Sequence, residues 1–418
     1  MLTTRGKAAS ISASKKEPDA RTMSGAQYVF IHPWLNREEC WGGLFVTAGE
    51  GADPDCLARL SAFCRADDNP SIRHSLPWFV PLLADTGATG GWPLDRTVFL
   101  IAEPESAADD AWQAPAQQVR SAGGKVGLLA FPHHPLPPAG KWNYVFVETT
   151  HARTTAPVKM MVLATQATIA IGSVKTRQDF DWALANQAAL ASAEFVQARA
   201  KEPSKPDMMR THLLQLLSLI TQDADTSAIE EIFRQEPKLS YSLLRLVNSA
   251  ALGLRTQINS FSQAINLLGR RQLQRWLQLL VYADPGGSGR PNPLLQWAAM
   301  RGRLLELAFL KINPPPQLAI SPDSAFMTGI FSLLDVLLNL PMEDILTQLP
   351  VSSPVKLALT ERVGPLGELL RAMENAERRK ADAASQILES LGIDCGDYVQ
   401  AQIEAIDWAA KVSQQASG

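Results

Sequence analysis

Three neighbouring stretches decide the fold of the second half of this chain: Leu243-Leu-Arg-Leu-Val-Asn-Ser-Ala250, Ile258-Asn-Ser-Phe-Ser-Gln-Ala-Ile-Asn-Leu-Leu-Gly269 and Arg270-Arg-Gln-Leu-Gln-Arg-Trp-Leu-Gln-Leu-Leu280. Their leucines recur at helical spacing and predict a buried helix face. Asn248 and Ser249 fall near a helix end, where short polar side chains bond to free backbone groups. Gly253 and Gly269 each permit a turn between helices. We therefore expect these four residues to be structural, with a partner contact as the alternative for Asn248.

The helical character begins after Glu202-Pro-Ser-Lys-Pro206, whose prolines and charges predict a linker. Beyond it, glycines and prolines separate short segments with apolar residues at helical spacing. We expect roughly ten helices with short connections, which is typical of an α-orthogonal bundle. The predicted domains are a disordered tail at 1–24, a first folded domain at 25–203 and an all-α domain at 204–418.

The three opening stretches resemble the core of an HDOD domain, a helical signalling module related to the metal-dependent HD phosphohydrolases. Members of that family usually lack the metal-binding histidines and aspartates. In this half the only histidine is His212, and Ser332 and Leu333 stand where the resemblance would place the His-Asp doublet. Two metals need several such ligands. The resemblance therefore implies signalling and predicts no metal-dependent hydrolysis in this half.

Arg270, Arg271 and Arg275 form the densest basic group of the helical half. A solvated helix face is the favoured interpretation, with a partner surface as the alternative. Glu377-Arg-Arg-Lys380 is likewise predicted to be a solvated start to a late helix. A net charge of −3 and the lack of aromatic stacking platforms argue against a nucleic-acid partner.

Short β-prone runs alternate with helix-compatible stretches in the first half, which predicts α/β structure with a buried, mostly parallel sheet or barrel. The predicted helices are 55–66, 111–121 and 178–200. The predicted strands are Tyr28-Val-Phe-Ile31, Leu44-Phe-Val46, Trp78-Phe-Val80, Thr97-Val-Phe-Leu-Ile101, Val126-Gly-Leu-Leu129, Tyr144-Val-Phe-Val147 and Thr168-Ile-Ala-Ile171.

This order of elements, from Tyr28 to Pro203, resembles a strongly divergent EAL domain, the barrel that hydrolyses cyclic di-GMP with two metals. The resemblance places Leu44 of Gly42-Gly-Leu-Phe-Val46 at a metal-ligand position. Leu129-Ala130-Phe131 stands where active members have paired aspartates. About 175 residues is short for eight strands, so the completeness of the barrel stays open.

Three EAL-type positions keep a polar residue: Glu103 after the fourth strand, Glu148 after the sixth, and Gln197 near the end of the domain. Two metals about 4 Å apart need several convergent carboxylates. We therefore expect no catalytic residue, no metal and no cofactor in either half.

The four cysteines, Cys40, Cys56, Cys64 and Cys395, show no CxxC pair and no nearby histidine cluster. We therefore predict neither a zinc site nor a disulfide framework. A reducing cytoplasm is the predicted compartment. Apolar segments are interrupted well before the roughly 18 residues of a membrane span, so no membrane association is expected.

The sequence thus predicts a non-catalytic cytoplasmic signal-transduction protein that acts through contacts with an unidentified protein partner. The alternative is a receptor for cyclic di-GMP or another nucleotide without turnover. A hydrolase with an unrelated site is a third hypothesis, although no Ser-His-Asp, Cys-His or carboxylate cluster can be assembled from the sequence.

Overall fold

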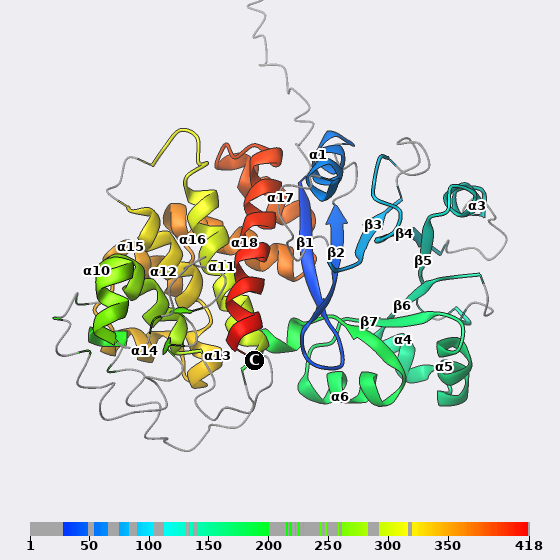
Figure 1. Ribbon diagram of the computed structural model, residues 1–418, viewed down its shortest axis with the longest axis horizontal. Coiled ribbons are helices and arrows are strands. Elements are labelled where there is room, and N and C mark those ends of the chain that lie inside the picture. The colour runs from blue at the N-terminus through cyan, green and yellow to red at the C-terminus, as the bar shows by residue number, and fades with distance from the viewer. Residues whose placement is uncertain are drawn as a thin grey trace, which may run out of the picture.

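The computed structural model has a barrel and a helical part that lie side by side, with α18 and β1 at their junction (Figure 1). The structure describes residues 28–48, 54–65, 75–82, 90–103, 113–130, 132, 134–136, 141–199, scattered positions between 215 and 258, 261–282, 292–316 and 320–416. The predicted tail at 1–24, the predicted linker and His212 lie outside these residues.

The first part is a closed barrel of eight strands in chain order. β1 runs antiparallel to both of its neighbours, and β2 to β8 are parallel. The barrel is therefore complete, although the chain length left this open. The strands are β1 (Val29–Leu35), β2 (Trp41–Ala48), β3 (Trp78–Pro81), β4 (Thr97–Ala102), β5 (Lys125–Leu129), β6 (Tyr144–Glu148), β7 (Thr168–Gly172) and β8 (Ala188–Ala191).

Helices surround this barrel: α1 (Pro54–Arg65), α3 (Gln113–Ser121), α4 (Thr149–Thr154), α5 (Pro157–Ala164), α6 (Arg177–Ala185) and the 3₁₀ turn η1 (Glu194–Gln197). The predicted helix over 178–200 is wrong in its second half, which contains β8 and η1. The β8 sequence Ala-Ala-Leu-Ala favours a helix by propensity. Pairing with β7 and β1 overrides that preference by closing the sheet.

Aromatic side chains fill the barrel. Trp34 and Phe45 stack with ring centroids 5.1 Å apart, and Phe146 lies 5.4 Å from each of them. Leu44, which we placed at a metal-ligand position, instead packs in the core outside the barrel. Because side chains alternate along a strand, its neighbours Gly43 and Phe45 face inward.

The second part is helical among the described residues, as predicted. Its long central helix α11 packs against α12, α16 and α18. The helices are α10 (Phe261–Leu280), α11 (Pro293–Phe309), α12 (Pro322–Phe331), α13 (Leu334–Leu338), α14 (Met342–Gln348), α15 (Ser353–Thr360), α16 (Gly364–Glu377), α17 (Ala381–Ser390) and α18 (Cys395–Ala416).

Asn248 binds two backbone segments together. Its amide nitrogen donates to the carbonyls of Leu244 and Ile258, and its oxygen accepts from the Ile258 N–H, each at 2.7 Å. Gly269 has a φ of 73° and breaks α10 into two helical pieces. Ser249 and Gly253 lie outside the described residues.

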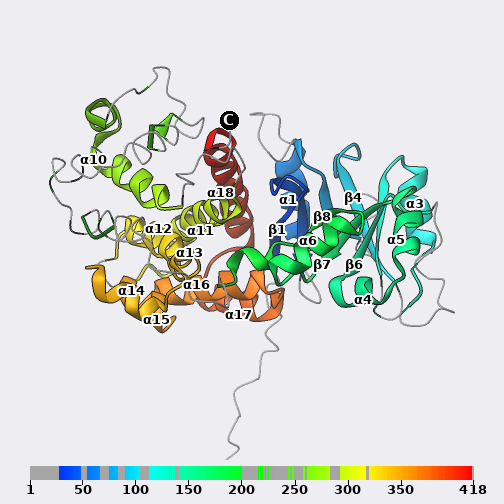
Figure 2. The same cartoon turned by 90° about the horizontal axis from the view of Figure 1, so that it is seen from below.

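The two parts share a buried junction. Gln402 of α18 accepts from the Ile31 N–H at 2.9 Å and donates to the Val29 carbonyl at 2.8 Å, much as a neighbouring strand would. Seen from below, α16 and α17 extend along the helical part as far as the barrel (Figure 2). The last three helices, α16 to α18, therefore all reach the barrel, and α18 is hydrogen-bonded to β1.

A disulfide between Cys56 in α1 and Cys395 at the start of α18 also joins the two parts. The prediction of no disulfide was therefore wrong. That prediction was based on the spacing of cysteines close together in the sequence, whereas this pair is 339 positions apart. Cys40 and Cys64 form no disulfide among the described residues.

Among the described residues, no single helix is long and apolar enough to cross a membrane. One bent pair, Pro322–Leu338 with Met342–Gln348, meets the criteria of length and composition alone.

Candidate functional site at the barrel mouth

The carboxyl ends of parallel barrel strands are where α/β barrels place their functional side chains. We use the name barrel mouth for this end, defined by His32, Thr47, Glu148, Gly172 and Ser192. All five come from different strands or from the residue that follows a strand. They lie on, or directly after, five consecutive strands of the closed barrel, β6, β7, β8, β1 and β2.

Arg379 of the helical part occupies the barrel mouth. Its Nη1 lies 3.0 Å from Glu148 Oε1, and its Nη2 lies 3.5 Å from Glu194 Oε1. The guanidinium carbon also lies 5.6 Å from the ring centroid of Trp34 and 5.9 Å from that of Phe45. A cation over aromatic faces is favourable. The helical part thus supplies a positive charge to a site built by the barrel.

Local backbone geometry brings Arg379 to this position. It follows α16 with a φ of 58°, a left-handed conformation that ends the helix and redirects the chain. A Cβ atom at Gly172 would lie 3.2 Å from Arg379 Nη2 and 2.9 Å from Glu148 Oε1. The absence of a side chain at Gly172 therefore leaves room for this ion pair.

His32 forms the wall of the mouth contributed by β1. Its Nε2 lies 2.8 Å from Thr47 Oγ1. Burial, together with the positive charge of Arg379, lowers the pKa of His32 to about 3. The imidazole is therefore neutral at physiological pH and acts as a hydrogen-bonding group.

Arg301 is the second connection between the two parts. It is 3% exposed and binds both carboxylate oxygens of Glu377, with Nε to Oε1 at 2.9 Å. It also donates to Gln197 Oε1 at 2.8 Å and to Ser332 Oγ at 2.9 Å. Burial opposes the charged form, but the carboxylate of Glu377 outweighs it, so the pKa of Arg301 is raised.

The polar EAL-type positions are therefore distributed over three sets of contacts. Glu148 binds Arg379, Gln197 binds Arg301, and Glu103 Oε1 lies 3.7 Å from His134 Nδ1. Ser332, at the position of the absent His-Asp doublet, holds Arg301 instead of a metal.

The arginines predicted to form a solvated face differ from one another. Arg275 is only 17% exposed and binds Asp323 and Glu306, so it lies inside the bundle and not on a free surface. Arg271 is 67% exposed and binds Asp323. Arg270 has no described side chain.

The prediction of a solvated helix start at Glu377-Arg-Arg-Lys380 was wrong. This segment is the end of α16 and the turn before α17. Glu377 is 11% exposed beside Arg301, and Arg379 enters the barrel mouth. Sequence reasoning missed Arg379 and Arg301 because their partners Glu148 and Gln197 lie more than 100 positions away. It also missed His32.

The described residues do not fit a two-metal centre. No three histidine, cysteine, aspartate or glutamate side chains converge on one point within the described part of the chain. Glu148 and Glu194 both face Arg379. Asp85, Glu105, Asp109 and Asp110, which follow β3 and β4 in sequence, lie outside the described residues.

Comparisons with known proteins identify the helical region. Residues 203–283 match the HDOD domain family. The chain is 32% identical over 220 residues to the cyclic di-GMP phosphodiesterase CdgJ of Vibrio cholerae, covering 50% of each chain. It is 27% identical over 206 residues to YuxH of Bacillus subtilis, covering 48% of this chain and 49% of the relative. The chain thus spans about half the length of the curated relatives it matches.

Among solved structures, the YkuI protein of Bacillus subtilis has an EAL domain and was crystallised with cyclic di-GMP and calcium. It is 12% identical, with a TM-score of 0.30 over 59% of this chain and 73% of that one.

One prediction is corrected by these comparisons. We expected no enzymatic activity, because both metal-ligand sets are incomplete in the sequence. The relative that is 32% identical is named a phosphodiesterase, which contradicts that expectation, and we withdraw it. The predicted signalling relationship and the two-part fold are supported. The chain contains an HDOD domain at residues 203–283, joined to an EAL-like barrel of eight strands.

Proposed function

We propose that this chain is a cyclic di-GMP signalling protein in which the helical part controls access to the barrel mouth through Arg379. The name of the relative from Vibrio cholerae supports this ligand class. The observation on which the proposal depends is the position of Arg379. Its guanidinium belongs to the helical part but contacts Glu148 and Glu194 of the barrel.

A nucleotide that enters the mouth meets Arg379 first. The guanidinium lies over the Trp34 and Phe45 rings, so it would have to move before a base could stack there. It also contacts Glu148 and Glu194 and so fills the space between these two side chains. Ligand entry therefore requires Arg379 to move, and the movement is transmitted to α16 and α17.

The same physical link operates in the other direction. A partner that shifts α16 or α17 would move Arg379 and change the affinity of the mouth, because coupling between two sites is reciprocal. We propose that such a partner is a protein bound by the helical part. The domain limits of 25–203 and 204–418, and a cytoplasmic location, remain predictions.

The test compares the full-length wild-type chain with Arg379→Ala. Binding of cyclic di-GMP is measured by calorimetry, and conversion to the linear dinucleotide by chromatography, with Mg²⁺ and Mn²⁺ present. Arg378→Ala is the matched control, because Arg378 is exposed in the same turn. We expect Arg379→Ala to bind the dinucleotide about tenfold more tightly, or to hydrolyse it faster, while Arg378→Ala behaves as wild type.

Two results would contradict the proposal. Weaker binding in Arg379→Ala would mean that the guanidinium holds the ligand instead of excluding it. Neither binding nor hydrolysis in any of the three proteins would remove cyclic di-GMP as the ligand.

A further inference from the structure

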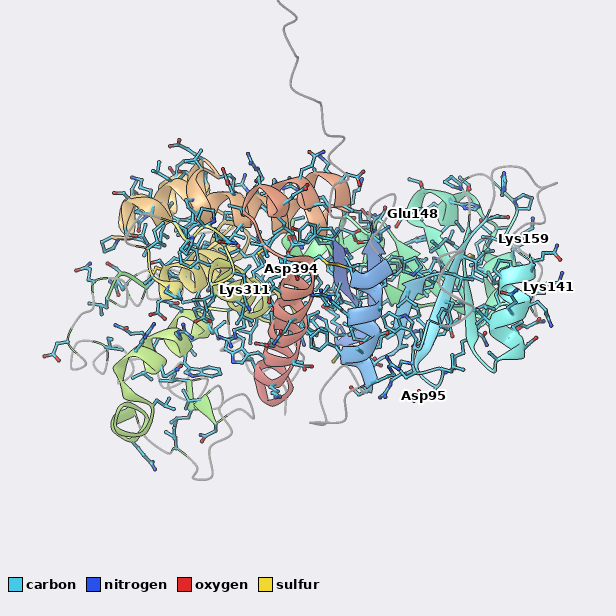
Figure 3. The ribbon with its side chains drawn as sticks, turned by 90° about the horizontal axis from the view of Figure 1, so that it is seen from above. Asp95, Lys141, Glu148, Lys159, Lys311 and Asp394 are labelled. Carbon is cyan, nitrogen blue, oxygen red and sulfur yellow. A yellow bond between two sulfur atoms is a disulfide. The ribbon has the colours of Figure 1, made fainter. Side chains whose placement is uncertain are left out.

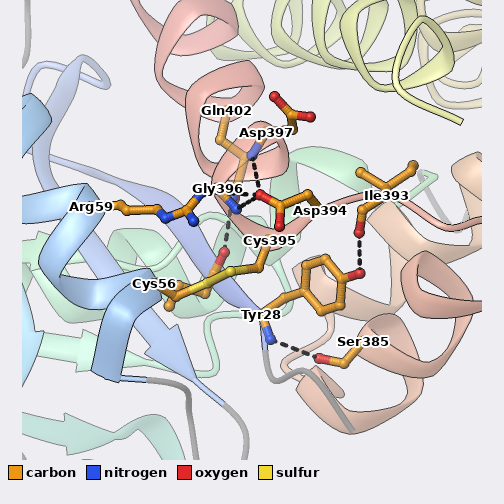
Figure 4. Close-up of a disulfide and its surroundings, with 11 residues drawn as sticks. Tyr28, Cys56, Arg59, Ser385, Ile393, Asp394, Cys395, Gly396, Asp397 and Gln402 are labelled. Carbon is orange, nitrogen blue, oxygen red and sulfur yellow. Dashed lines mark hydrogen bonds and ion pairs between the residues drawn. A yellow bond between two sulfur atoms is a disulfide. The ribbon is translucent and has the colours of Figure 1, made fainter. Parts of the chain in front are cut away.

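We propose that Cys56 and Cys395 form a reversible thiol–disulfide lock that holds Arg379 in the barrel mouth. This inference rests on the proposed function and adds a means of regulation. The disulfide joins α1, on the outside of the barrel, to the first residue of α18 (Figure 4).

The lock lies on the same segment as Arg379. Arg379 and Cys395 are 16 positions apart, and most of the residues between them form α17. Both ends of this segment are attached to the barrel, one by the Arg379–Glu148 ion pair and the other by the disulfide. Figure 3 labels Glu148 and Asp394, which lie beside these two attachment points.

Contacts between the disulfide and α17 hold the middle of the segment. The Tyr28 N–H, at the start of the barrel, donates to Ser385 Oγ at 3.4 Å, and the Tyr28 hydroxyl donates to the Ile393 carbonyl. Tyr28 is buried, and burial raises the pKa of its phenol, so the hydroxyl remains a donor. The segment from 379 to 395 therefore lies along the barrel as one strap.

The ion pair beside the disulfide is weak by comparison. Arg59 Nη1 lies 3.1 Å from Asp394 Oδ1, but both side chains are more than half exposed. Solvent screens such a pair and leaves it little net stabilisation. The covalent bond is thus the strongest attachment at this end of the strap.

Accessibility favours exchange at Cys395. It is 9% exposed at the N-terminal end of α18, whereas Cys56 is fully buried. An external thiolate attacks the Cys395 sulfur, forms a mixed disulfide there and displaces Cys56 as a thiolate, which takes up a proton. A helix N-terminus and the nearby Arg59 guanidinium both favour an anion, which helps Cys395 leave as a thiolate in the second exchange.

The electrons and atoms balance through a second exchange. Another thiolate of the reductant attacks the mixed disulfide, so the reductant leaves as its own disulfide and Cys395 becomes a thiol. Two electrons and two protons are transferred in total. The reverse reaction uses a small-molecule disulfide as the oxidant.

Opening the lock should free the strap. Cleavage removes the covalent attachment of one end of the strap to α1. Hydrogen exchange over residues 378–395 should then accelerate by about 30-fold, which corresponds to about 2 kcal/mol. Arg379 should leave the mouth more often, and binding of cyclic di-GMP should strengthen.

The experiment uses the full-length protein equilibrated with either glutathione disulfide or dithiothreitol. Mass spectrometry after alkylation reports whether Cys56 and Cys395 are paired. Hydrogen exchange and calorimetry with cyclic di-GMP follow on each sample. Cys395→Ser should behave as the reduced wild type in both buffers, and Cys40→Ser, which removes a free cysteine, should keep the response.

The outcomes separate this inference from the proposed function. Absence of the Cys56–Cys395 pair in the oxidised sample overturns the lock, while the Arg379→Ala comparison still tests the function. Equal exchange rates at 378–395 in the two buffers overturn it as well. If no sample binds the dinucleotide, the proposed function fails, and the lock is judged by hydrogen exchange alone.

Discussion

Arg379 Nη1 and Glu148 Oε1 lie 3.0 Å apart, although 231 residues separate them in the chain. Arg379 comes from the turn between α16 and α17, and Glu148 ends β6. Their pairing means that the mouth of the barrel is completed by the helical part. Two folds that the sequence presents as consecutive units therefore share one site.

This ion pair should contribute modestly to stability. The Arg379 and Glu148 side chains are 30% and 37% exposed, so solvent screens their attraction. A double-mutant cycle with Arg379→Ala and Glu148→Gln should give a coupling of about 0.5–1 kcal/mol in the free energy of unfolding. Denaturant titration measures it, and additive effects would mean that the pair does not form.

Arg301 should be far more important for stability. Replacement by Met leaves the Glu377 carboxylate buried without its partner, which should cost about 3–5 kcal/mol. Adding Glu377→Met should recover part of the loss, because the unpaired charge is then gone. Lys311→Ala, which breaks an exposed ion pair with Asp397, is the control and should be neutral. A double variant as unstable as Arg301→Met would contradict this account.

His32 should make the protein sensitive to acid. Its pKa is about 3 in the folded chain and 6.5 in the unfolded reference, so the unfolded state takes up the proton first as pH falls. Its contribution to stability is complete above pH 6.5 and is lost between pH 6.5 and 3, by up to about 1.4 kcal/mol per pH unit.

The measurement is the free energy of unfolding against pH for the wild type and His32→Gln. Between pH 6.5 and 3, the free energy of unfolding should fall less steeply with decreasing pH in His32→Gln than in the wild type. Parallel curves would mean that His32 does not titrate differently on folding.

Gln402 should fix β1 to α18. Gln402→Leu leaves the Ile31 N–H and the Val29 carbonyl without their partner, at a cost of about 1–3 kcal/mol for each buried group. Hydrogen exchange of the Ile31 amide should accelerate. Gln400→Ala is the control, because Gln400 is exposed and binds only Glu404 among the described contacts. Unchanged protection at Ile31 would show that Gln402 is dispensable.

Seven of the eight strands were predicted from local sequence, since apolar β-prone runs such as Thr97-Val-Phe-Leu-Ile101 have a strong local signal. β8 was not, because its alanines favour a helix and only pairing with β7 makes it a strand. Local preference was overridden where the barrel closes.

The candidate site was predictable only in part. Glu148 and Gln197 were singled out from their order along the chain, but their partners Arg379 and Arg301 were not. Contacts between residues more than 100 positions apart leave no spacing pattern to detect. The Cys56–Cys395 bond was missed for the same reason.

The sequence by itself determined the two kinds of fold, because hydrophobic periodicity is a local property that one segment displays without its neighbours. The tertiary structure alone decided that the barrel closes, that a disulfide joins the two parts and that Arg379 lies against Glu148. These three features depend on distances between segments that only packing brings together. The site at the barrel mouth therefore belongs to both parts of the chain.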